Sequence, residues 1–252
     1  AAQDAPSAGT ENQERGEGGE LRILQWQAPS HLSPHTATGD KEGIASAIVL
    51  EPLMHLGENA ELVPILITEV PTIDNGLLAE DLTSVTYNLL EGVTWSDGEP
   101  FTAEDVRFTW EWVMDEANNS INTGVFGQIA DIEVVDDLTA RVSFTGPNPS
   151  WFVPHTGAAE GAIYPKHILE AGGDAHDAFS LKPIGTGAFV VDEFTPNDEA
   201  RFSANPNFRE PNKPYFSNIY LKGGGDPASA ARAVLETGEY HFAWYLPVEP
   251  EI

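Results

Sequence analysis

Short runs in which apolar and polar positions alternate recur along the chain, and this alternation is typical of β-strands. Within SVTYNLL, the apolar residues Val85, Tyr87 and Leu89 fall on one face. A four-residue connection, 136–139, joins two neighbouring runs and predicts a β-hairpin. The predicted strands lie at residues 21–26, 84–90, 132–135, 140–144, 218–222, 239–244 and, after a glycine turn, within 185–195.

Helical spacing of apolar residues marks two further segments. The segment 42–56 has apolar residues at helical intervals, namely Ile44, Ile48, Val49 and Leu53. The segment 226–236 carries boundary signals as well, because Asp226 can cap its start, Pro227 suits the first turn and Gly238 follows its end. We therefore expect a helix in each segment.

The stretch VTWSDGEPFTAEDVRFTW, residues 93–110, concentrates turn and capping signals. Residues 93–95 predict a short strand, and Gly98 predicts the turn that ends it because glycine accepts positive φ. Thr102 followed by Asp105 predicts a capping box at the start of a helix. The predicted inner face of that helix consists of Val106, Thr109, Trp110 and Val113. The stretch is therefore expected to be a scaffold rather than a ligand contact.

Interleaved hairpins and strand–helix–strand steps predict an α/β fold with a mixed β-sheet, rather than a barrel or a helix bundle. A length of 252 residues allows one large domain or two small ones, and a hydrophobic fraction of 41% supplies a core. The chain has no apolar run of about 18 residues, so no membrane span is expected. Residues 1–20 hold no large apolar side chain and are expected to form a disordered polar leader.

Composition narrows the classes of function. Twelve Lys and Arg against 40 Asp and Glu give a net charge of −28, which disfavours binding to nucleic acid or to anionic lipid. This acidic, lysine-poor surface suits either a protein from a saline habitat or an ordinary exported protein. If the stability of the protein does not rise with NaCl, the saline habitat is excluded. The absence of cysteine excludes disulfides, thiolate catalysis and Cys-ligated zinc.

The stretch GVTWSDGEPFTAEDVRFTWEWV resembles a characteristic region of the family 5 extracellular solute-binding proteins, the peptide, oligopeptide and nickel receptors of ABC importers. Other segments resemble the family in the same order, namely LRILQWQAPSHLSPHTATGD, AIVLEPLMHL, IYPKHILE, PIGTGAFVVDEF, ANPNFREPNKPYFSNIYLK and ASAARAVLETGEYHFAW. The resemblance runs from about residue 21 to residue 252, so it covers nearly all of the chain except the polar leader.

The resemblance implies a type II periplasmic-binding-protein fold, in which two lobes close on a ligand. Family members are considerably longer, so the second lobe is expected to be incomplete here. The expected division places part of lobe I at residues 21–45 and 175–252, and an inserted α/β subdomain of lobe I at residues 46–174. Surface that would meet the remaining elements is then left bare, and we expect the chain alone to be less stable or stickier than a longer form.

The resemblance also implies candidate ligand-binding residues, which are Trp26, Gln27, His31, Trp151, Trp244 and Tyr245. The first three follow the first predicted strand, in a loop that resembles the family's ligand-facing loop. The last two stand where the chain would cross between lobes. Aromatic rings there could stack on a side chain or a sugar face, with core or hinge packing as the alternative. Trp151 lies in a loop that reaches either the cleft rim or the subdomain core.

Two other motifs are interpreted as structural. His31 and His35 are four residues apart, as in a helical metal pair, but two nearby prolines break any helix there, so no metal site is expected. The glycines of residues 185–187 open a strand and lack the Lys-Ser/Thr step of a phosphate-binding loop, which favours a backbone turn. The glycine run 223–225 precedes a predicted helix and favours a flexible connection over an anion site.

The resulting hypothesis is a receptor of an ABC importer, with peptide as the favoured solute, that captures its ligand between two lobes and delivers it to a membrane permease. The implied partners are a small solute and that permease, and the protein is expected to be a periplasmic or extracellular monomer without cofactor, metal or catalytic residues. A lipid anchor to the outer face of the cell membrane would need a cysteine that this chain lacks. The alternatives are a carbohydrate or metal-chelate receptor of the same transport class, a carboxylate-based hydrolase, and a structural surface module.

Overall fold

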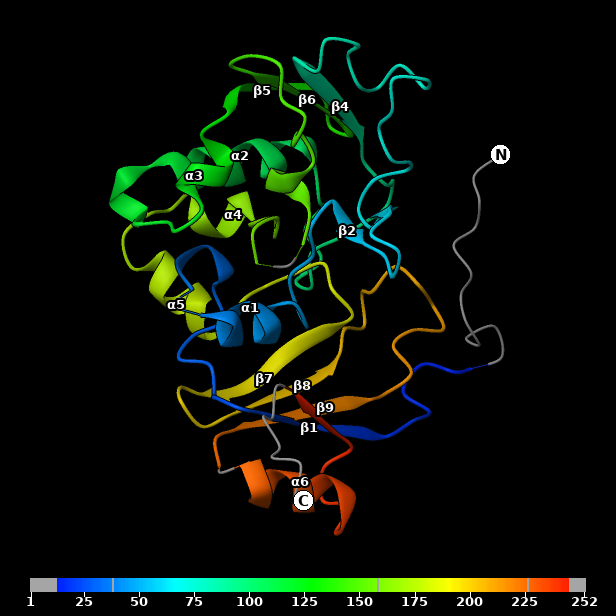
Figure 1. Ribbon diagram of the computed structural model, residues 1–252, viewed down its shortest axis with the longest axis vertical. Coiled ribbons are helices and arrows are strands. Elements are labelled where there is room, and N and C mark those ends of the chain that lie inside the picture. The colour runs from blue at the N-terminus through cyan, green and yellow to red at the C-terminus, as the bar shows by residue number, and fades with distance from the viewer. Residues whose placement is uncertain (1–12, 38, 158, 226, 245–252) are drawn as a thin grey trace.

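The computed structural model describes residues 13–37, 39–157, 159–225 and 227–244, and its largest sheet has five strands in the order β10-β1-β9-β8-β7 (Figure 1). These strands are β1 (Glu20–Gln25), β7 (Phe189–Thr195), β8 (Glu199–Ala204), β9 (Asn218–Gly223) and β10 (Phe242–Trp244). Strand β1 runs parallel to both of its neighbours, β9 and β10, whereas β7, β8 and β9 pair antiparallel. The predicted α/β fold with a mixed sheet is confirmed.

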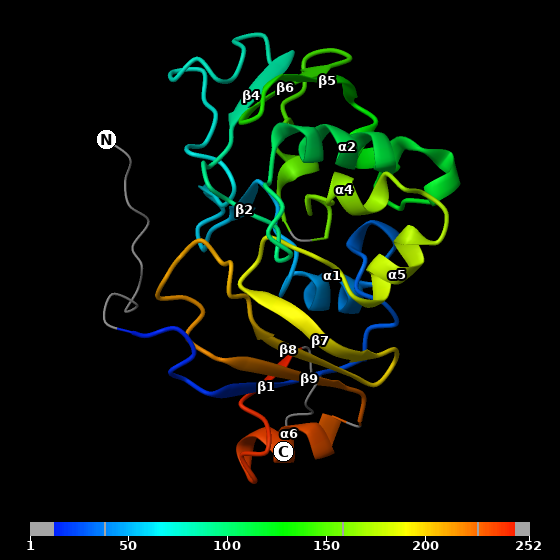
Figure 2. The same ribbon diagram turned by 180° about the vertical axis from the view of Figure 1, so that it is seen from behind.

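Both faces of the five-stranded sheet are covered. Leu221 of β9 packs in a cluster with Val49, on the side of helix α1 (Asp40–Ser46), while the adjacent Tyr220 packs on the opposite side with helix α6 (Pro227–Leu235). Figures 1 and 2 show α6 on the outer side of the sheet and α1 on the side that faces the rest of the molecule. Burial on two faces explains why the strand segment Ile-Tyr-Leu, residues 219–221, is continuously apolar.

A second region, the subdomain, holds the buried apolar cluster that extends from Leu50 to Phe179. Its sheet has the strand order β4-β6-β5, and β2 and β3 form a separate pair. The elements of the subdomain are β2 (Met54–Leu56), β3 (Leu62–Pro64), β4 (Ser84–Asn88), α2 (Ala103–Met114), α3 (Thr123–Phe126), β5 (Ile129–Asp136), β6 (Thr139–Phe144), α4 (Lys166–Leu169) and α5 (Ala175–Leu181). Short 3-10 turns lie at Pro34–Thr36, Glu116–Asn118 and Val153–His155.

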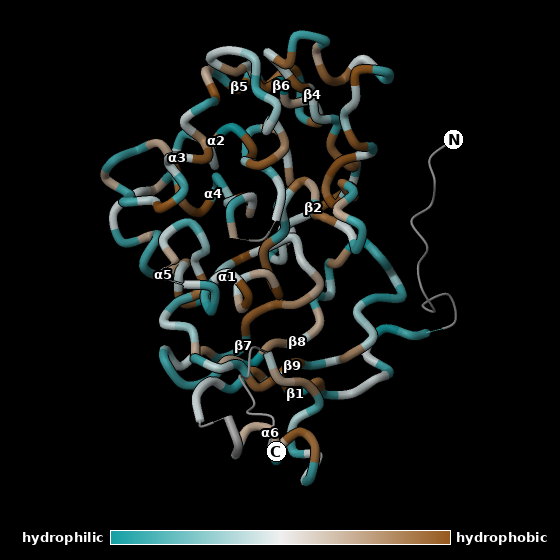
Figure 3. Tube along the Cα trace, in the orientation of Figure 1, coloured by the Kyte–Doolittle hydropathy of each residue, from teal (hydrophilic) through white to brown (hydrophobic). Residues whose placement is uncertain are grey.

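The subdomain core follows the predicted alternation. Val85, Tyr87 and Leu89 are buried, and β5 pairs with β6 as the predicted hairpin. Figure 3 shows apolar segments along the strands and through the middle of the molecule, with mostly polar loops outside. Among the described residues, no helix is both long enough and apolar enough to cross a bilayer.

A close backbone contact links the segment just before the subdomain to the turn that opens β7, and an ion pair joins the two regions. The carbonyl of Val49 accepts the Gly187 N–H at 2.9 Å, and a Cβ on Gly185 would lie 1.9 Å from the same oxygen. Glycine is therefore required here for packing, which supports a turn in place of a phosphate loop. Nearby, both guanidinium nitrogens of Arg209 donate to the carboxylate of Glu51 at 2.7 and 2.9 Å.

The predicted helix over residues 42–56 is wrong beyond Ser46. Helix α1 ends there, and the chain continues through turns into strand β2. Pro52 disfavours a helical conformation at the residue before it, and it forms an isolated bridge with Ala162. Because tertiary contacts occupy the backbone of this segment, the helical spacing of Val49 and Leu53 does not produce a helix; both side chains are instead buried in the two clusters.

The start of helix α2 is as the sequence predicted, whereas the strand predicted just before it does not form. The Asp105 carboxylate accepts the Thr102 N–H at 2.9 Å, so the capping box is confirmed. Residues 93–95 do not form a sheet strand, since Thr94 makes only an isolated bridge with Pro100 around the turn at Gly98.

The inner face of α2 requires one correction. Val106, Thr109 and Val113 are buried as expected, but the buried tryptophan is Trp112, while Trp110 is half-buried. Trp112 packs edge-on against the ring of Tyr164, whose segment crosses the helix. That neighbour is distant in sequence, so the local spacing could not choose between the two tryptophans.

Residues 13–19 lie against the connection between β8 and β9. The guanidinium of Arg15 donates to the backbone carbonyls of Asn205, Pro206, Phe208 and Glu210 at 2.7–3.1 Å. These charge-assisted hydrogen bonds hold a segment that has no apolar anchor of its own. The predicted disordered leader therefore does not extend to residue 20, and residues 1–12 lie outside the described part of the chain.

Candidate functional site

The parallel strands β1, β9 and β10 end at one edge of the sheet. Gln25 and Trp244 stand side by side in register, and the backbone N–H of Trp26 donates to the carbonyl of Trp244 at 3.3 Å. On the other side, the Gly224 N–H donates to the carbonyl of Gln25 at 3.1 Å. In open α/β sheets, ligands bind in the crevice outside the carboxyl ends of the strands, which makes this edge the first place to look.

A pocket of about 290 Å³ opens at this edge, and we call it the sheet-edge pocket. It is lined by Gln25, Trp26, Gln27, Gly39, Asp40, Lys41, Ile44 and Trp244. Trp26 is 43% exposed and Trp244 is 44% exposed, although large aromatic side chains in folded proteins are on average well buried. Two half-exposed indoles around one hollow form the kind of apolar surface that marks a contact site.

The polar groups of the sheet-edge pocket come from β1 and from the start of α1. Asp40 and Lys41 supply one negative and one positive charge. Gln25 is almost fully buried, and its Nε2 donates to the carbonyl of Lys41 at 3.2 Å. Its Oε1 has no hydrogen-bond partner among the described residues. The pocket therefore combines apolar walls with an acid and a base, while the unpaired Oε1 of Gln25 lies beneath its surface.

Glu42 holds the loop that carries Trp26 and Gln27. The backbone N–H and the hydroxyl of Ser30 both donate to Glu42 Oε1, at 3.0 and 2.9 Å. Burial opposes ionisation of this carboxyl, but the hydrogen bonds from Ser30 and the neighbouring Lys41 ammonium hold the pKa of Glu42 below its usual value. Glu42 is thus a charged anchor for the loop beneath the pocket.

The glycine run at residues 223–225 lets the same loop pass over the end of β9. A Cβ on Gly223 would lie 2.1 Å from the backbone of Ala28, so only glycine fits. Gly224 and Gly225 have φ of 88° and 107°, in the region that favours glycine. The run therefore has a packing and turning role beside the pocket.

The structure brings together three of the residues predicted from the sequence, Trp26, Gln27 and Trp244, around the sheet-edge pocket. Tyr245 lies outside the described residues. His31 is half-buried, does not line the pocket, and accepts the Ser33 N–H through Nδ1 at 3.2 Å. Burial lowers the pKa of His31.

Trp151 lies in the subdomain, away from the sheet-edge pocket. Its ring is 7% exposed and packs against the rings of Tyr87 and Phe152. It also borders a separate open hollow with Ile73 and Leu78. The structure therefore places Trp151 among core residues rather than with the other predicted ligand contacts.

His35, the other member of the histidine pair, is fully buried beside Asn122 and the carbonyl of Ala162, at 2.9 and 2.8 Å. Burial lowers the pKa of His35 to about 4. Within the described ranges, no group of three or more His, Cys, Asp or Glu side chains is arranged to hold a metal ion.

Sequence reasoning missed several residues of the sheet-edge pocket, namely Gln25, Gly39, Asp40, Lys41 and Ile44. The helix was expected to begin at residue 42, whereas α1 begins at Asp40. The Gly-Asp step before it is a helix-start signal that could have indicated the earlier boundary. The missed residues lie near Trp244 because strands from the two ends of the chain pair in parallel, and no local sequence pattern reveals that pairing.

The family model for bacterial extracellular solute-binding proteins, family 5, middle region, matches residues 61–251. The fold, the strand-end pocket and this match together show that the chain belongs to the family 5 extracellular solute-binding proteins. A Brucella ovis protein that carries the name of an ABC transporter peptide-binding protein is 29% identical over 171 residues, which cover 66% of this chain and 31% of that protein.

Solved structures of type II periplasmic binding proteins share the fold. NikZ from Campylobacter jejuni, in complex with Ni(L-His), is 25% identical with a TM-score of 0.76 over 88% of this chain and 42% of its own. OppA from Haemophilus influenzae, in complex with RPPGFSPFR, is 21% identical with a TM-score of 0.76 over 90% of this chain and 46% of its own. The chain thus spans about a third to a half of the length of these proteins.

Proposed function

We propose that this chain forms part of a receptor that binds peptides for an ABC importer, and that the sheet-edge pocket is its share of the ligand site. The observation that carries the proposal is the pair of half-exposed indoles, Trp26 and Trp244, at the carboxyl ends of adjacent parallel strands. The name of the Brucella ovis relative and the peptide held by OppA support peptide as the solute class.

The chemistry of the pocket suits an extended peptide. The indoles offer flat apolar surface to side chains of varied shape. The charges of Asp40 and Lys41 would complement the ammonium and carboxylate groups of a zwitterion. No step in this account needs a nucleophile or a proton transfer, so the receptor would release its solute unchanged.

Capture would require a second lobe that closes on the sheet edge, as in other hinged binding proteins. Elements of the receptor outside the described residues would supply that lobe and would present the closed form to a membrane permease. We place the receptor in the periplasm or outside the cell, in agreement with the description of its family.

Ligand-linked stabilisation tests the proposal. The longest form of the protein isolated from its native cells is heated with and without a pool of short peptides. A receptor gains about 2.7 kcal/mol of stability when free ligand exceeds the dissociation constant a hundredfold. Unchanged melting with peptides, together with turnover of a chromogenic glycoside, would favour a hydrolase and end the proposal.

Substitutions then locate the binding. We expect Trp244→Ala and Trp26→Ala each to weaken peptide binding by about 1–3 kcal/mol, because each removes a central aromatic contact. Tyr215→Ala is the matched control, since Tyr215 is 41% exposed but does not line the pocket. If all three variants bind peptide with the same affinity, the peptide does not bind at the sheet-edge pocket.

A metal-chelate receptor is the second candidate, because the NikZ structure holds Ni(L-His). Stabilisation by nickel with histidine, in the absence of any effect of peptides, would favour this reading. The same two tryptophan variants would then report whether the chelate lies at the sheet edge.

A further inference from the structure

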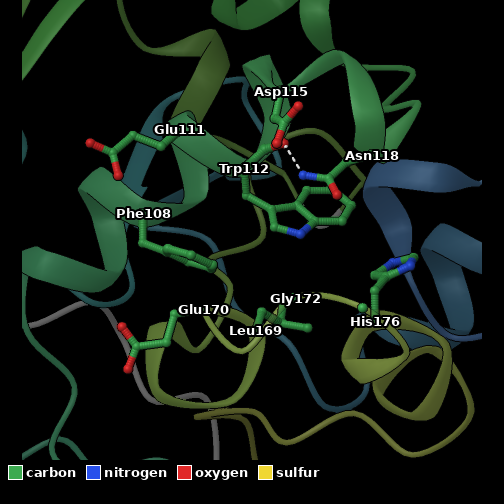
Figure 4. A pocket seen from close by; sticks show the side chains of 10 residues that line it. Phe108, Glu111, Trp112, Asp115, Asn118, Leu169, Glu170, Gly172 and His176 are labelled. Carbon is green, nitrogen blue, oxygen red and sulfur yellow. Dashed lines mark hydrogen bonds between the residues drawn. The ribbon is translucent and has the colours of Figure 1, made fainter.

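A second pocket, here called the subdomain pocket, lies between α2 and the segment that carries α4 and α5 (Figure 4). Its volume is about 270 Å³, so it suits a ligand smaller than a typical drug. It is lined by Phe108, Glu111, Trp112, Asp115, Asn118, Leu169, Glu170, Gly172, Gly173 and His176. It shares no residue with the sheet-edge pocket.

Trp112 presents an unsatisfied donor to the subdomain pocket. The residue is 6% exposed, and its backbone carbonyl accepts from Asn118 at 2.9 Å, but no hydrogen bond to its indole N–H exists among the described residues. Figure 4 shows the indole nitrogen directed toward Leu169 and Gly172. This N–H is not among the donors that the protein shields fully from solvent, so an oxygen atom of a ligand in the pocket can reach it and accept its hydrogen bond.

The charge of the subdomain pocket is negative. Glu111, Asp115 and Glu170 contribute carboxylates, while the described lining includes no Lys or Arg. Arg107 pairs with Glu111 at 2.8 Å, and Lys166, which pairs with Glu104 at 2.9 Å, also attracts Glu170 from outside the lining, so Asp115 and Glu170 are carboxylates of the pocket without a direct ion pair among the described residues. Burial lowers the pKa of His176, so this ring does not add a positive charge near neutral pH.

We propose that the subdomain pocket binds a small organic ammonium ion that also carries a hydroxyl or carbonyl oxygen. The apolar walls of Phe108 and Leu169 receive its alkyl groups, and Asp115 and Glu170 balance its charge. Its oxygen accepts the Trp112 indole N–H. Aromatic and acidic surroundings together are the usual environment for alkylated ammonium groups.

Nitrogen–proton correlation spectra of the whole chain, titrated with choline, test the proposal. The chain has six tryptophans, each with one indole signal, and Trp112→Phe identifies the signal of Trp112 by its loss. We expect choline to shift this signal to saturation. The neutral isostere of choline, in which a tert-butyl group replaces the trimethylammonium group, should need at least about tenfold higher concentration, equivalent to 1.4 kcal/mol.

Charge variants provide the second arm. The double variant Asp115→Asn, Glu170→Gln keeps the shape of the pocket and should weaken choline binding at least about tenfold. Glu116→Gln is the matched control because Glu116 is exposed next to Asp115 but does not line the pocket. The proposal is overturned if choline leaves the Trp112 signal unmoved, shifts only the signals of Trp26 and Trp244, binds no better than its isostere, or binds the double variant as well as the parent chain.

Discussion

Tryptophan has opposite environments in the two regions of the molecule. In the subdomain, Trp95 is 1% exposed and its indole N–H donates to Asp105 at 3.3 Å. At the sheet edge, Trp26 and Trp244 are nearly half exposed around a pocket. Tryptophan is therefore a core residue in one region and part of an exposed contact surface in the other. The position of the backbone decides between these two environments.

The cause of this difference lies in topology. Trp95 is enclosed because the turn at Gly98 and the capped start of α2 fold back over it, with Phe101 against its ring. At the sheet edge, parallel strands end together, and the indoles of Trp26 and Trp244 border an open pocket. Stability should therefore depend on the first region and recognition on the second.

Truncation of a tryptophan in each region should give the largest contrast. We expect Trp95→Ala to cost about 3–5 kcal/mol of unfolding free energy, because it leaves a cavity and removes one of the three hydrogen bonds that the Asp105 carboxylate accepts. Trp244→Ala should cost less than about 1 kcal/mol, because the ring is already half in water. Urea unfolding of both variants measures these losses. Similar losses of unfolding free energy would show that stability does not depend mainly on the subdomain.

Buried histidine makes the subdomain sensitive to acid. The ring of His155 is fully buried, neither of its nitrogens has a hydrogen-bond partner among the described residues, and burial lowers its pKa to about 3. The folded state keeps His155 neutral while the unfolded chain takes up a proton near pH 6.5, so stability is complete above that pH and is lost as pH falls toward 3. Between pH 6.5 and 4 this single group should remove about 3 kcal/mol.

The variant His155→Phe isolates that effect, since phenylalanine fits the same aromatic surroundings without titrating. We expect its stability to fall less steeply with acid than that of the parent chain, and to equal or exceed it at pH 7. His55→Gln, at an exposed site, is the matched control for the loss of a histidine. Parallel profiles for His155→Phe and the parent chain would contradict the assignment.

The ion pair between Glu51 and Arg209 should couple the two regions by a smaller amount. Both side chains are mostly buried, with 16% and 18% exposure, and the pair is bidentate. We expect Glu51→Gln and Arg209→Met each to cost about 2 kcal/mol, because each leaves a partly buried group without its partner. A double-mutant cycle in urea should give a coupling of about 1 kcal/mol or more, and additive losses would show that the pair does not join the regions.

The smallest predicted effect concerns the loop beneath the sheet-edge pocket. Ser30→Ala removes one of the two hydrogen bonds to Glu42 and should cost about 1 kcal/mol, with some loss of peptide affinity. Ser203→Ala removes an exposed hydrogen bond to Asp192 on the same sheet and should cost less than about 0.5 kcal/mol. If the two substitutions lower the unfolding free energy equally, Glu42 does not anchor the loop.

The sequence predicted those elements whose signals are local. The alternation of Val85, Tyr87 and Leu89 and the capping box at Thr102 and Asp105 reappear in the structure because they depend on neighbours in the chain. The helix expected over residues 42–56 fails because distant partners, above all Gly187, bind its backbone.

The candidate site was predictable only in part, for the same reason. Trp26, Gln27 and Trp244 were found through resemblance to a family, and the structure places them around one pocket. Asp40 and Lys41 were missed because they reach this pocket through the packing of α1 beside β1. Trp151 occupies a core position instead, and only the tertiary neighbours of a tryptophan distinguish these two outcomes.

The most direct test of the sheet-edge pocket is to follow the indole signals of Trp26 and Trp244 while a pool of short peptides is added to the longest native form of the protein. We predict that these two signals shift to saturation together, while those of Trp95 and Trp151 stay in place. Saturable binding of peptides that leaves Trp26 and Trp244 unmoved would contradict the assignment of the ligand site to this edge of the sheet.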